Sequence, residues 1–291
     1  MTLYRVFGLF FMINFNGQIV DNNTLLSINN RGLNYGDALF ETIKTSYGKV
    51  LFWEDHYFRL MASMRIMRME IPMNFTMQYL ESQIQELLIA NNLQNVSSRV
   101  KLLVYRNEGG LYLPTTNDIS FVISSAKLED DFYLPKEGPY EVDLFKDFYI
   151  APSLLSTLKT NNKAIHVVGS IFSKENKLQN CLLLNTEKQV VEALNGNLFL
   201  VKGTIIKTPP LEDGCLKGVM RKQIIEILKT LSEYDIQETS ISPFELQKAD
   251  ELWVTNVITG IQPITKYRKK SFTNKTAKQV LQKLNVKMRL T

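Results

Sequence analysis

The chain has 291 residues, of which 45% are hydrophobic and 22% are charged, and its formal net charge is +5. This composition is typical of a globular protein with one large or two ordinary domains. The 34 basic residues are scattered among 29 acidic ones, and the one basic cluster, Lys266 to Lys270, is expected to be a solvated turn. We therefore expect no nucleic-acid partner, whereas a small anionic substrate would suit this charge balance.

Cysteine usage and the N-terminus indicate the compartment. Cys181 and Cys215 give neither a disulfide framework nor metal-ligand spacing, so both are expected to be small buried residues in a reducing environment. Residues 1–11 are predicted to be an extension before the fold. The apolar run from Val6 to Phe15 lacks a small-residue cleavage site, and no stretch is as long as a membrane span. These features predict a cytoplasmic protein with no membrane partner and no metal.

The first half of the chain predicts a small α/β domain over residues 12–127. Short strands come first, and a helix follows in which Leu60, Met64 and Met67 recur at helical spacing, with Arg59 on the opposite face beside His56 and Ser63. A second helix is predicted over 77–91, and strands over 99–106 and 120–125. Residues 128–141 contain Pro and Gly without a clear period, and they are the predicted interdomain linker.

The second half, residues 142–291, predicts a larger α/β domain in which strands and helices alternate. Two apolar runs flank Lys202-Gly203 as in a hairpin. Gly218 opens an amphipathic helix, a polar turn over 256–260 follows the strand "ELWV", and a last helix is predicted over 276–288. The predicted fold class is therefore α/β, an α+β small domain followed by a larger α/β domain.

The chemistry must rest on lysine, on carboxylates or on a cofactor. The sequence has no GxGxxG, P-loop or GxSxG motif, and its two histidines, His56 and His166, poorly supply a metal centre or a catalytic triad. Lys159 lies among small and apolar residues before a helix, where partial burial would make it a competent Schiff-base amine. Glu192 lies in an apolar run, where a carboxylate needs a cationic partner.

The glycine at position 218 and the turn over 256–260 add backbone N–H groups that could bind phosphate. Each feature alone also has an ordinary interpretation. Lys159 could be a solvated surface lysine, Glu192 a strand-edge charge, Arg59 a partner of Glu54 or Asp55, and Gly218 a plain helix entry. Together, an amine, a carboxylate, an arginine and phosphate-binding turns are the components of a pyridoxal phosphate site.

In their order along the chain, these segments resemble one family. "NRGLNYGDALFETI", "HYFRL", "LKTNN", "EALNGNLFLVKGTIIKTPP", "GCLKGVMR" and "LWVTNVITGIQPI" are similar to the segments of class IV aminotransferases, the fold type IV enzymes of pyridoxal 5′-phosphate. This family includes branched-chain aminotransferases, D-amino acid aminotransferases and aminodeoxychorismate lyases. The resemblance covers about residues 12–264, and it implies the D-amino acid aminotransferase-like fold and a homodimer.

The resemblance also implies the role of each matching residue. Lys159 would be the Schiff-base lysine that moves the proton between the substrate Cα and the cofactor C4′, and Glu192 would hold the pyridine nitrogen protonated. The phosphate would be bound by Arg59 and by the turns, through Gly218, Val219, Asn256, Val257 and Ile258. Tyr35 and Phe40, on the first strand of the small domain, would line the substrate pocket together with Lys101 or Arg106. On a regular strand Lys101 and Arg106 face opposite sides, so at most one of them would reach the pocket.

Three functions remain open on these residues. Branched-chain aminotransferases usually carry a tyrosine where this chain has Ala164, and D-amino acid aminotransferases pair the Arg106 position with a histidine where this chain has Glu108. The preferred hypothesis is therefore a lyase that converts 4-amino-4-deoxychorismate to p-aminobenzoate and pyruvate in folate biosynthesis. The second is an amino acid aminotransferase of the branched-chain or D-amino acid type that uses a keto acid acceptor. The third is a catalytically silent family member.

Overall fold

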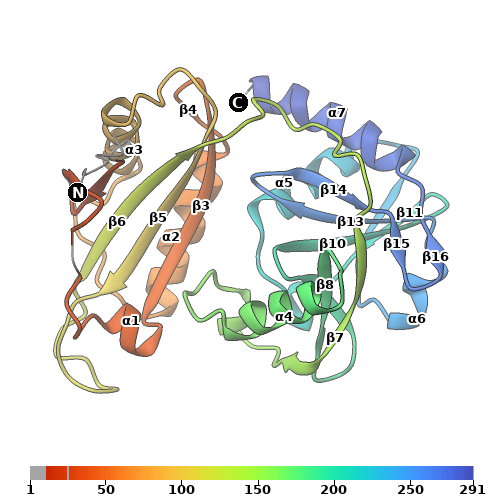
Figure 1. Cartoon of the computed structure of the whole chain (residues 1–291), viewed down its shortest axis with the longest axis horizontal. Helices are drawn as coiled ribbons and strands as arrows, with labels where there is room; N and C mark the ends of the chain where they lie inside the picture. Colours follow the sequence, from red (N-terminus) through yellow and green to blue (C-terminus); the bar gives the residue numbers. More distant parts are fainter. Residues whose placement is uncertain (1–10, 25, 291) are drawn as a thin grey trace, which may run out of the picture. The chain divides into compact units, whose positions relative to one another are not determined.

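The structure is a computed structural model that describes residues 11–24 and 26–290. The predicted extension 1–11 lies outside the described residues except for Phe11. The chain divides into two compact units, of which the first ends at Asp131 and the second begins at Phe132 (Figure 1). This division falls within the predicted linker 128–141.

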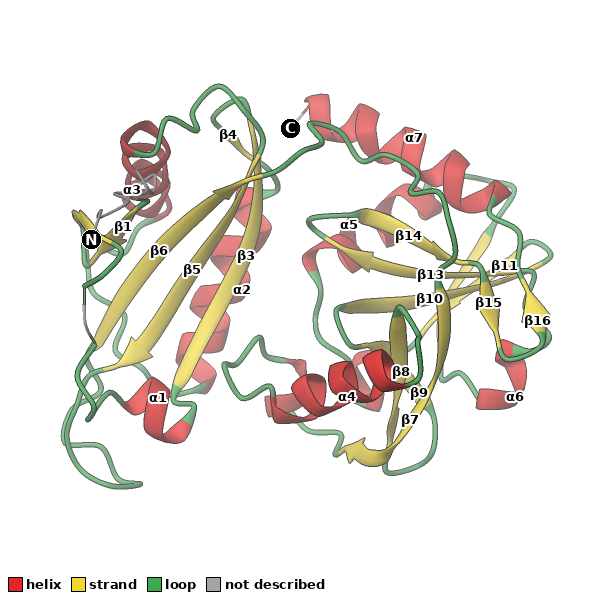
Figure 2. Ribbon diagram, in the orientation of Figure 1, coloured by secondary structure: helices red, strands yellow, loops and turns green. Residues whose placement is uncertain are grey.

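The first unit is a six-stranded sheet in the order β2-β1-β6-β5-β3-β4, with two longer helices packed on it. Helix α2 packs against β3, and α3 packs against β1 and β6 (Figure 2). The elements are β1 (Met12–Phe15), β2 (Gln18–Asp21), α1 (Arg31–Tyr35), β3 (Ala38–Ser46), β4 (Lys49–Val50), α2 (Trp53–Ile66), α3 (Met77–Ala90), β5 (Ser98–Arg106) and β6 (Ile119–Lys127).

Helix α2 confirms the predicted apolar stripe but corrects the predicted polar face. Leu60 and Met64 are buried as predicted, whereas Met67 is the half-buried C-cap after the helix, and His56 and Ser63 are buried as well. At about 3.6 residues per turn, a residue three positions along the helix lies only about 60° around the axis, so Ser63 is next to Leu60 and not opposite it. The polar residues of this face therefore pack against the sheet together with the apolar ones.

The central strands of the first unit pair without interruption. Ala38 pairs with Tyr105 at one end of β3 and Thr45 pairs with Ser98 at the other, in an antiparallel register without a bulge. Side chains alternate between the two faces of such a strand. Lys101 and Arg106 therefore lie on opposite faces, as the sequence predicts.

The second unit is built on a ten-stranded sheet in the order β12-β11-β10-β9-β8-β7-β15-β16, from which β13 and β14 branch at β10. Helices α5 and α7 pack against each other and against this branch. The elements are β7 (Glu141–Ile150), η1 (Leu155–Thr157), α4 (Ala164–Glu175), β8 (Asn180–Asn185), β9 (Val190–Ala193), β10 (Gly196–Lys202), β11 (Ile205–Thr208), η2 (Leu211–Asp213), α5 (Val219–Lys229), β12 (Asp235–Glu238), α6 (Pro243–Leu246), β13 (Glu251–Asn256), β14 (Gly260–Ile264), β15 (Lys266–Tyr267), β16 (Lys270–Ser271) and α7 (Lys275–Leu290).

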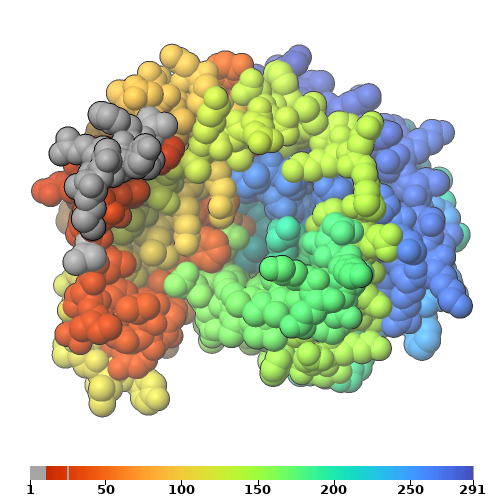
Figure 3. All heavy atoms as spheres, viewed as in Figure 1, coloured from red at the N-terminus to blue at the C-terminus, as the bar shows by residue number. Residues whose placement is uncertain are grey.

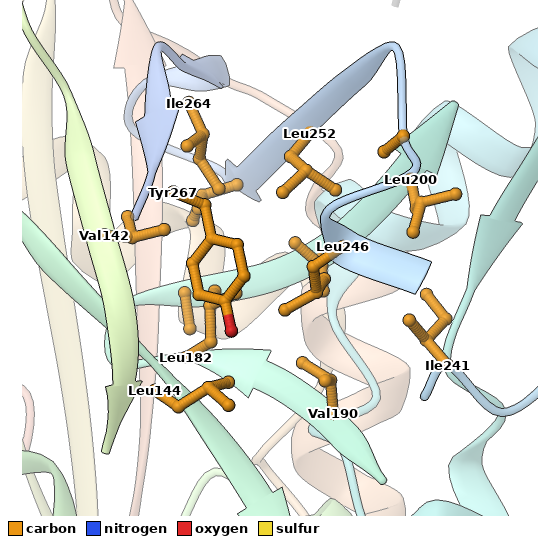
Figure 4. Close-up of a cluster of buried hydrophobic side chains, with 14 of the residues drawn as sticks. Val142, Leu144, Leu182, Val190, Leu200, Ile241, Leu246, Leu252, Ile264 and Tyr267 are labelled. Atoms are coloured by element: carbon orange, nitrogen blue, oxygen red, sulfur yellow. The ribbon is translucent and has the colours of Figure 1, made fainter. Parts of the chain in front are cut away.

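A large hydrophobic cluster forms the core of the second unit, with side chains such as Leu182, Val190, Leu252 and Ile264 (Figure 4). Tyr267 belongs to this cluster, so the predicted solvated turn over 266–270 is wrong at that residue: the turn is a hairpin that inserts one aromatic ring into the core. Burial of this kind supplies most of the stability of a domain, at about 25 cal/mol per Å² of apolar area.

Local sequence signals are confirmed in the second unit. Strands β10 and β11 form the predicted hairpin, and Gly203 has a φ of 60°, which a two-residue hairpin turn requires. Both cysteines are free and buried, as predicted, and burial raises the pKa of the Cys215 thiol to about 12. Among residues 11–24 and 26–290, no helix has both the length and the apolar character needed to cross a bilayer.

Candidate active site

Lys159 lies on the segment between η1 and α4, and both ends of that segment are anchored. At the start, the Lys217 N–H donates to the Thr157 carbonyl at 3.1 Å. At the far end, His166 in the first turn of α4 reaches Glu192. The half-buried Lys159 therefore lies on a segment whose two ends are both anchored by groups close to Glu192.

Glu192 stands in a row of residues that crosses three neighbouring strands. It pairs with Asn197 across β9 and β10, and Asn197 pairs with Thr255 across β10 and β13. Glu192 is buried, and it accepts a hydrogen bond from the Leu216 N–H at Oε2, at 2.9 Å. Its other oxygen, Oε1, lies 3.4 Å from His166 Nε2. The carboxylate predicted from the sequence is thus buried and has two polar contacts.

Asn197, which the sequence did not single out, holds the chain entry to α5. Its Nδ2 donates to the Leu216 carbonyl at 2.8 Å. The peptide groups on either side of Leu216 are therefore held by two adjacent strands, with the N–H on Glu192 and the C=O on Asn197. This fixes where α5 begins relative to the sheet.

Helix α5 begins at Val219 with Gly218 as its N-cap, and no side chain caps it. The first N–H that bonds back along the helix is that of Lys222, which donates to the Gly218 carbonyl. The N–H groups of Val219, Met220 and Arg221 therefore have no carbonyl within the helix to pair with. Such a helix start favours an anion. The Gly218 N–H itself donates to Leu216, so Val219 is the stronger of these two predicted phosphate contacts.

Gly218 has a steric reason to be glycine. Its φ of −72° is open to any residue, but a Cβ at this position would lie 2.0 Å from Asn197 Oδ1. The side chain that holds Leu216 therefore occupies the space that a larger residue would need.

The turn between β13 and β14 is the second predicted phosphate-binding turn. Asn256 Oδ1 accepts hydrogen bonds from the N–H groups of Ile258 and Thr259, each at 3.0 Å. Thr259 Oγ1 is buried and has no hydrogen-bond partner among the described residues. The turn thus offers two N–H donors, now covered by an amide oxygen, and one unpaired hydroxyl.

Tyr133 packs against this turn. Its hydroxyl donates to the Val257 carbonyl at 2.9 Å, and a Cβ on Gly260 would lie only 2.8 Å from carbon atoms of the Tyr133 ring. Burial raises the pKa of Tyr133 well above its usual range, so the hydroxyl stays protonated and keeps donating. Gly260 has a φ of 69°, a conformation that glycine adopts readily.

Arg59 lies in the first unit, where it forms a buried cluster with Glu41 and His56. Arg59 Nε donates to Glu41 Oε1 at 2.8 Å, its Nη2 donates to Oε2, and His56 Nδ1 contacts Oε2 at 2.7 Å. Burial alone would raise the pKa of Glu41, but the charge of Arg59 and the hydrogen bonds from His56 and Arg59 outweigh it and lower the pKa to about 2. Arg59 therefore has a buried partner in Glu41, which the sequence did not single out for it.

The residues predicted to line the substrate pocket are placed by α1, β3 and β5. Tyr35 lies on the short helix α1 and not on a strand, because Asn30 caps this helix and Gly36, with a φ of 65°, ends it. Phe40 and Lys101 lie on the face of β3 and β5 that is turned away from Glu41, and the Lys101 amine is 5.1 Å from the centre of the Phe40 ring. Burial, with a smaller effect of the Arg99 charge, lowers the pKa of Lys101.

Arg106 is engaged within its own unit. Its guanidinium donates to Asp37, to Asn117 and to the carbonyls of Met67 and Arg68. Two of these four hydrogen bonds tie the end of β5 to the residues after α2, and the other two tie it to the residue before β3 and to the loop before β6. Of the two predicted cations, Lys101 is therefore the better candidate for contact with a substrate.

The second unit alone fits pyridoxal 5′-phosphate. Glu192 is a buried carboxylate that could pair with a protonated ring nitrogen, and the amine of Lys159 is carried by the adjoining segment. The open N–H groups at the start of α5 and the unpaired Thr259 hydroxyl suit a phosphate. Among the described residues, no group of three or more His, Cys, Asp or Glu side chains could hold a metal ion.

Comparisons with known proteins identify the family. The family model described as "Amino-transferase class IV" matches residues 38–267. An aminodeoxychorismate lyase from Vibrio harveyi is 26% identical over 244 residues, which are 83% of this chain and 87% of the relative. A D-alanine aminotransferase from Listeria innocua is 26% identical over 266 residues, which are 86% of this chain and 85% of the relative.

Solved structures share the fold. The branched-chain amino acid aminotransferase from Thermobaculum terrenum in its PLP form superposes with a TM-score of 0.81 at 18% identity, over 94% of this chain and 92% of that one. The fold predicted from the sequence is thereby confirmed.

The Glu41 cluster predicts how the stability of the chain depends on pH. The pKa of Glu41 is about 2 in the folded state against an ordinary value of 4.5, so its contribution is complete above about pH 4.5 and is lost as the pH falls towards 2. We expect Glu41→Gln to lower the free energy of unfolding by about 3–5 kcal/mol at pH 7, because it leaves Arg59 buried without its counter-charge. Urea unfolding of both proteins between pH 7 and pH 3 measures this difference.

The matched control is Glu54→Gln, which removes an exposed carboxylate from the first turn of α2, the helix that carries Arg59 and His56. It should change the stability little at any pH. A Glu41→Gln deficit of the same size at pH 3 and at pH 7 would contradict the ionic role of Glu41.

Proposed function

Because the chain belongs to the class IV aminotransferase family, we propose that it is a pyridoxal phosphate enzyme that converts 4-amino-4-deoxychorismate to p-aminobenzoate and pyruvate. The family model covers most of the chain and confirms the resemblance seen in the sequence. As a family member, the chain is an enzyme whose cofactor is pyridoxal 5′-phosphate, which when bound supplies an electron sink for the carbanion formed next to the substrate nitrogen. The choice of lyase chemistry within the family is the proposal.

Glu192 and the two turns would bind and orient the cofactor. The buried Glu192 carboxylate would hold a proton on the pyridine nitrogen, and the N–H groups from Val219 onward would bind the phosphate with the 256–260 turn. The resemblance also implies that Arg59 binds the phosphate, and Glu41 keeps its guanidinium in one orientation. Glu192 and the two turns would thus orient the cofactor before any chemistry takes place.

Lys159 would move the proton. Its neutral amine removes the hydrogen from the ring carbon of the substrate that carries the amino group. The bond between the neighbouring carbon and the enolpyruvyl oxygen then breaks, and the substrate ring becomes aromatic. Lys159 can return its proton to the departing enol, which becomes pyruvate, so the amine ends in its starting state.

The observation that carries the lyase proposal is the half-buried Lys101 amine beside the Phe40 ring. Aminodeoxychorismate has two carboxylates and a flat ring, so an amine and an aromatic ring side by side match both parts of it. Ala164, where branched-chain aminotransferases usually carry a tyrosine, also favours the lyase, because it leaves no phenol at the start of α4.

The second candidate is an aminotransferase that uses a keto acid. It is favoured by the similarity to a D-alanine aminotransferase, which matches the similarity to the lyase at 26% identity. The first proton transfer by Lys159 is the same in both reactions. The two differ in whether a second substrate is needed, and this difference can be measured.

We also propose a cytoplasmic homodimer. Leu111, Tyr112 and Leu113 are three consecutive residues that are 76–90% exposed. The Arg31 guanidinium donates to the main-chain carbonyls of Gly109 to Tyr112 in the same loop. A rigid loop that presents apolar side chains is suited to contact with a second copy. Sedimentation of the purified chain measures the assembly directly.

Gly218→Ala should weaken cofactor binding by about tenfold or more. The added Cβ displaces Asn197, and the hydrogen bond from Asn197 to Leu216 is worth about 1–3 kcal/mol once its partner is left buried. Fluorescence titration with pyridoxal 5′-phosphate gives the dissociation constant. In an Asn197→Ala background the same glycine substitution should cost little, since the clash is gone, and an undiminished cost there would show that the clash is not the cause.

Lys101→Met should raise KM for aminodeoxychorismate by about 10–100-fold, because a charge-assisted contact is worth about 1.5–3 kcal/mol, and it should leave cofactor binding unchanged. Arg99→Ala is the matched control, since it removes an exposed cation from the same face of β5. If both variants kept the wild-type KM, Lys101 would not contact the substrate.

The reaction itself is tested with the purified, cofactor-loaded chain and aminodeoxychorismate in the absence of any keto acid. We expect p-aminobenzoate and pyruvate to be released in equal amounts over many turnovers. Lys159→Ala should abolish this release, while Lys174→Ala, at an exposed position on α4, should not.

Other outcomes of this assay separate the alternatives. Turnover that requires a keto acid, with an amino acid as donor, would establish the aminotransferase. A chain that neither changes the cofactor absorption with any amine nor loses anything in Lys159→Ala would be the silent family member.

A further inference from the structure

We propose that His166 is a positioning residue that donates its Nε2–H to Glu192 and fixes the plane of that carboxylate beneath the cofactor ring. This inference rests on the proposed function, in which Glu192 pairs with the pyridine nitrogen. It concerns a residue for which neither the sequence motifs nor the family resemblance gives a role.

The contact joins the half-buried His166 to the buried Glu192 within the second unit. His166 Nε2 lies 3.4 Å from Glu192 Oε1, at the long end of hydrogen-bond distances, and the two side chains are 19% and 9% exposed. His166 is the third residue of α4, and α4 lies at the surface of its unit in Figure 3 with Val167, Val168 and Ile171 exposed. The imidazole, like the buried Ser173 hydroxyl further along, is thus a polar group that this helix directs inward.

The other ring nitrogen determines which tautomer is present. His166 Nδ1 is buried and has no hydrogen-bond partner among the described residues. A buried N–H without an acceptor costs about 1–3 kcal/mol, and a charged imidazolium would carry such an N–H at Nδ1. A hydrogen on Nε2 and none on Nδ1 avoids this cost, and it makes the ring a donor to Glu192.

Two donors then hold the carboxylate from different elements. His166 in α4 donates to Oε1, and the Leu216 N–H before α5 donates to Oε2. A carboxylate has about four lone-pair sites, so each oxygen keeps one for the pyridine nitrogen. With one donor on each oxygen the carboxylate cannot rotate freely, and its remaining lone pairs keep a fixed direction.

Removing the donor should therefore affect the reaction more than cofactor affinity. In His166→Leu one oxygen of Glu192 loses its partner, and we expect kcat to fall by about 10–100-fold, as for the loss of a hydrogen bond to a charged group. KM and the dissociation constant for pyridoxal 5′-phosphate should change by less than about threefold, because the phosphate contacts remain. His166→Gln should restore most of kcat, since its Nε2 can supply the N–H from nearly the same place.

Two spectroscopic measurements separate positioning from a loss of structure. With pyridoxal 5′-phosphate labelled with ¹⁵N in its ring, the nitrogen resonance should move towards the unprotonated position in His166→Leu and return in His166→Gln. Lys174→Ala, at an exposed position two turns further along α4, is the control and should leave the resonance in place. An unchanged resonance and an unchanged kcat in His166→Leu would overturn the proposal.

The second measurement needs neither cofactor nor turnover. The chain has two histidines, so His166→Gln identifies the ring signals of His166 in a ¹H–¹⁵N correlation spectrum of the cofactor-free protein. We expect an Nε2–H tautomer whose signal moves in Glu192→Gln, and an Nδ1–H tautomer would refute the hydrogen bond. A chain that did not bind pyridoxal 5′-phosphate at all would contradict the proposed function. The spectrum of the cofactor-free protein would still show whether His166 donates to Glu192.

Discussion

The stretch of main chain around Leu216 is the point on which the candidate site depends. Glu192 on β9 accepts from its N–H, and Asn197 on β10 donates to its carbonyl, so two neighbouring strands hold both sides of one residue. These two hydrogen bonds therefore also determine the position of the uncapped start of α5, which follows Leu216 in the chain. The carboxylate proposed to face the cofactor ring and the helix start proposed to face its phosphate are therefore fixed by the same short loop. The sheet, and not a flexible segment, therefore sets the distance between the Glu192 carboxylate and the start of α5.

The first unit uses a buried charge in a comparable way. Glu41 is surrounded by Arg59 and His56 on one helix, and its low pKa keeps it ionised over the whole physiological range. Burying such a cluster is costly unless every charge has a partner, which is why the contacts are so close. The cluster fixes the orientation of Arg59, because two of its nitrogens donate to Glu41 and the rest of the guanidinium then points in one direction.

How far the sequence predicts this protein depends on the range of the interaction. The β10–β11 hairpin, the start of α5 and the turn after β13 follow from residues within a few positions of one another, and all three are confirmed. The family and its fold were also accessible, because six segments occur in a specific order. The short helix at Tyr35 was missed because its cap, Asn30, looks like any loop asparagine.

Contacts between distant positions could not be predicted. Glu41 and Arg59 are 18 residues apart, Asn197 and Leu216 are 19 apart, and His166 and Glu192 are 26 apart. A polar residue in a buried strand was the one signal of such a contact, and Glu192 was singled out on that ground. Glu41 and Asn197 carry the same signal, since each interrupts an apolar strand, and both could have been noticed.

Asn256 gives the phosphate turn a property that a bare loop would lack. Its side-chain oxygen already occupies the N–H groups of Ile258 and Thr259, so the turn is closed on itself. If this turn binds the cofactor phosphate as proposed, the phosphate would have to replace this internal amide, and the amide would return when the phosphate leaves. Binding at the turn would then be a competition between two acceptors, one of which belongs to the chain itself. The Asn256 side chain would thus keep the loop in shape whenever no cofactor is bound, and it would lower the affinity of the turn for phosphate.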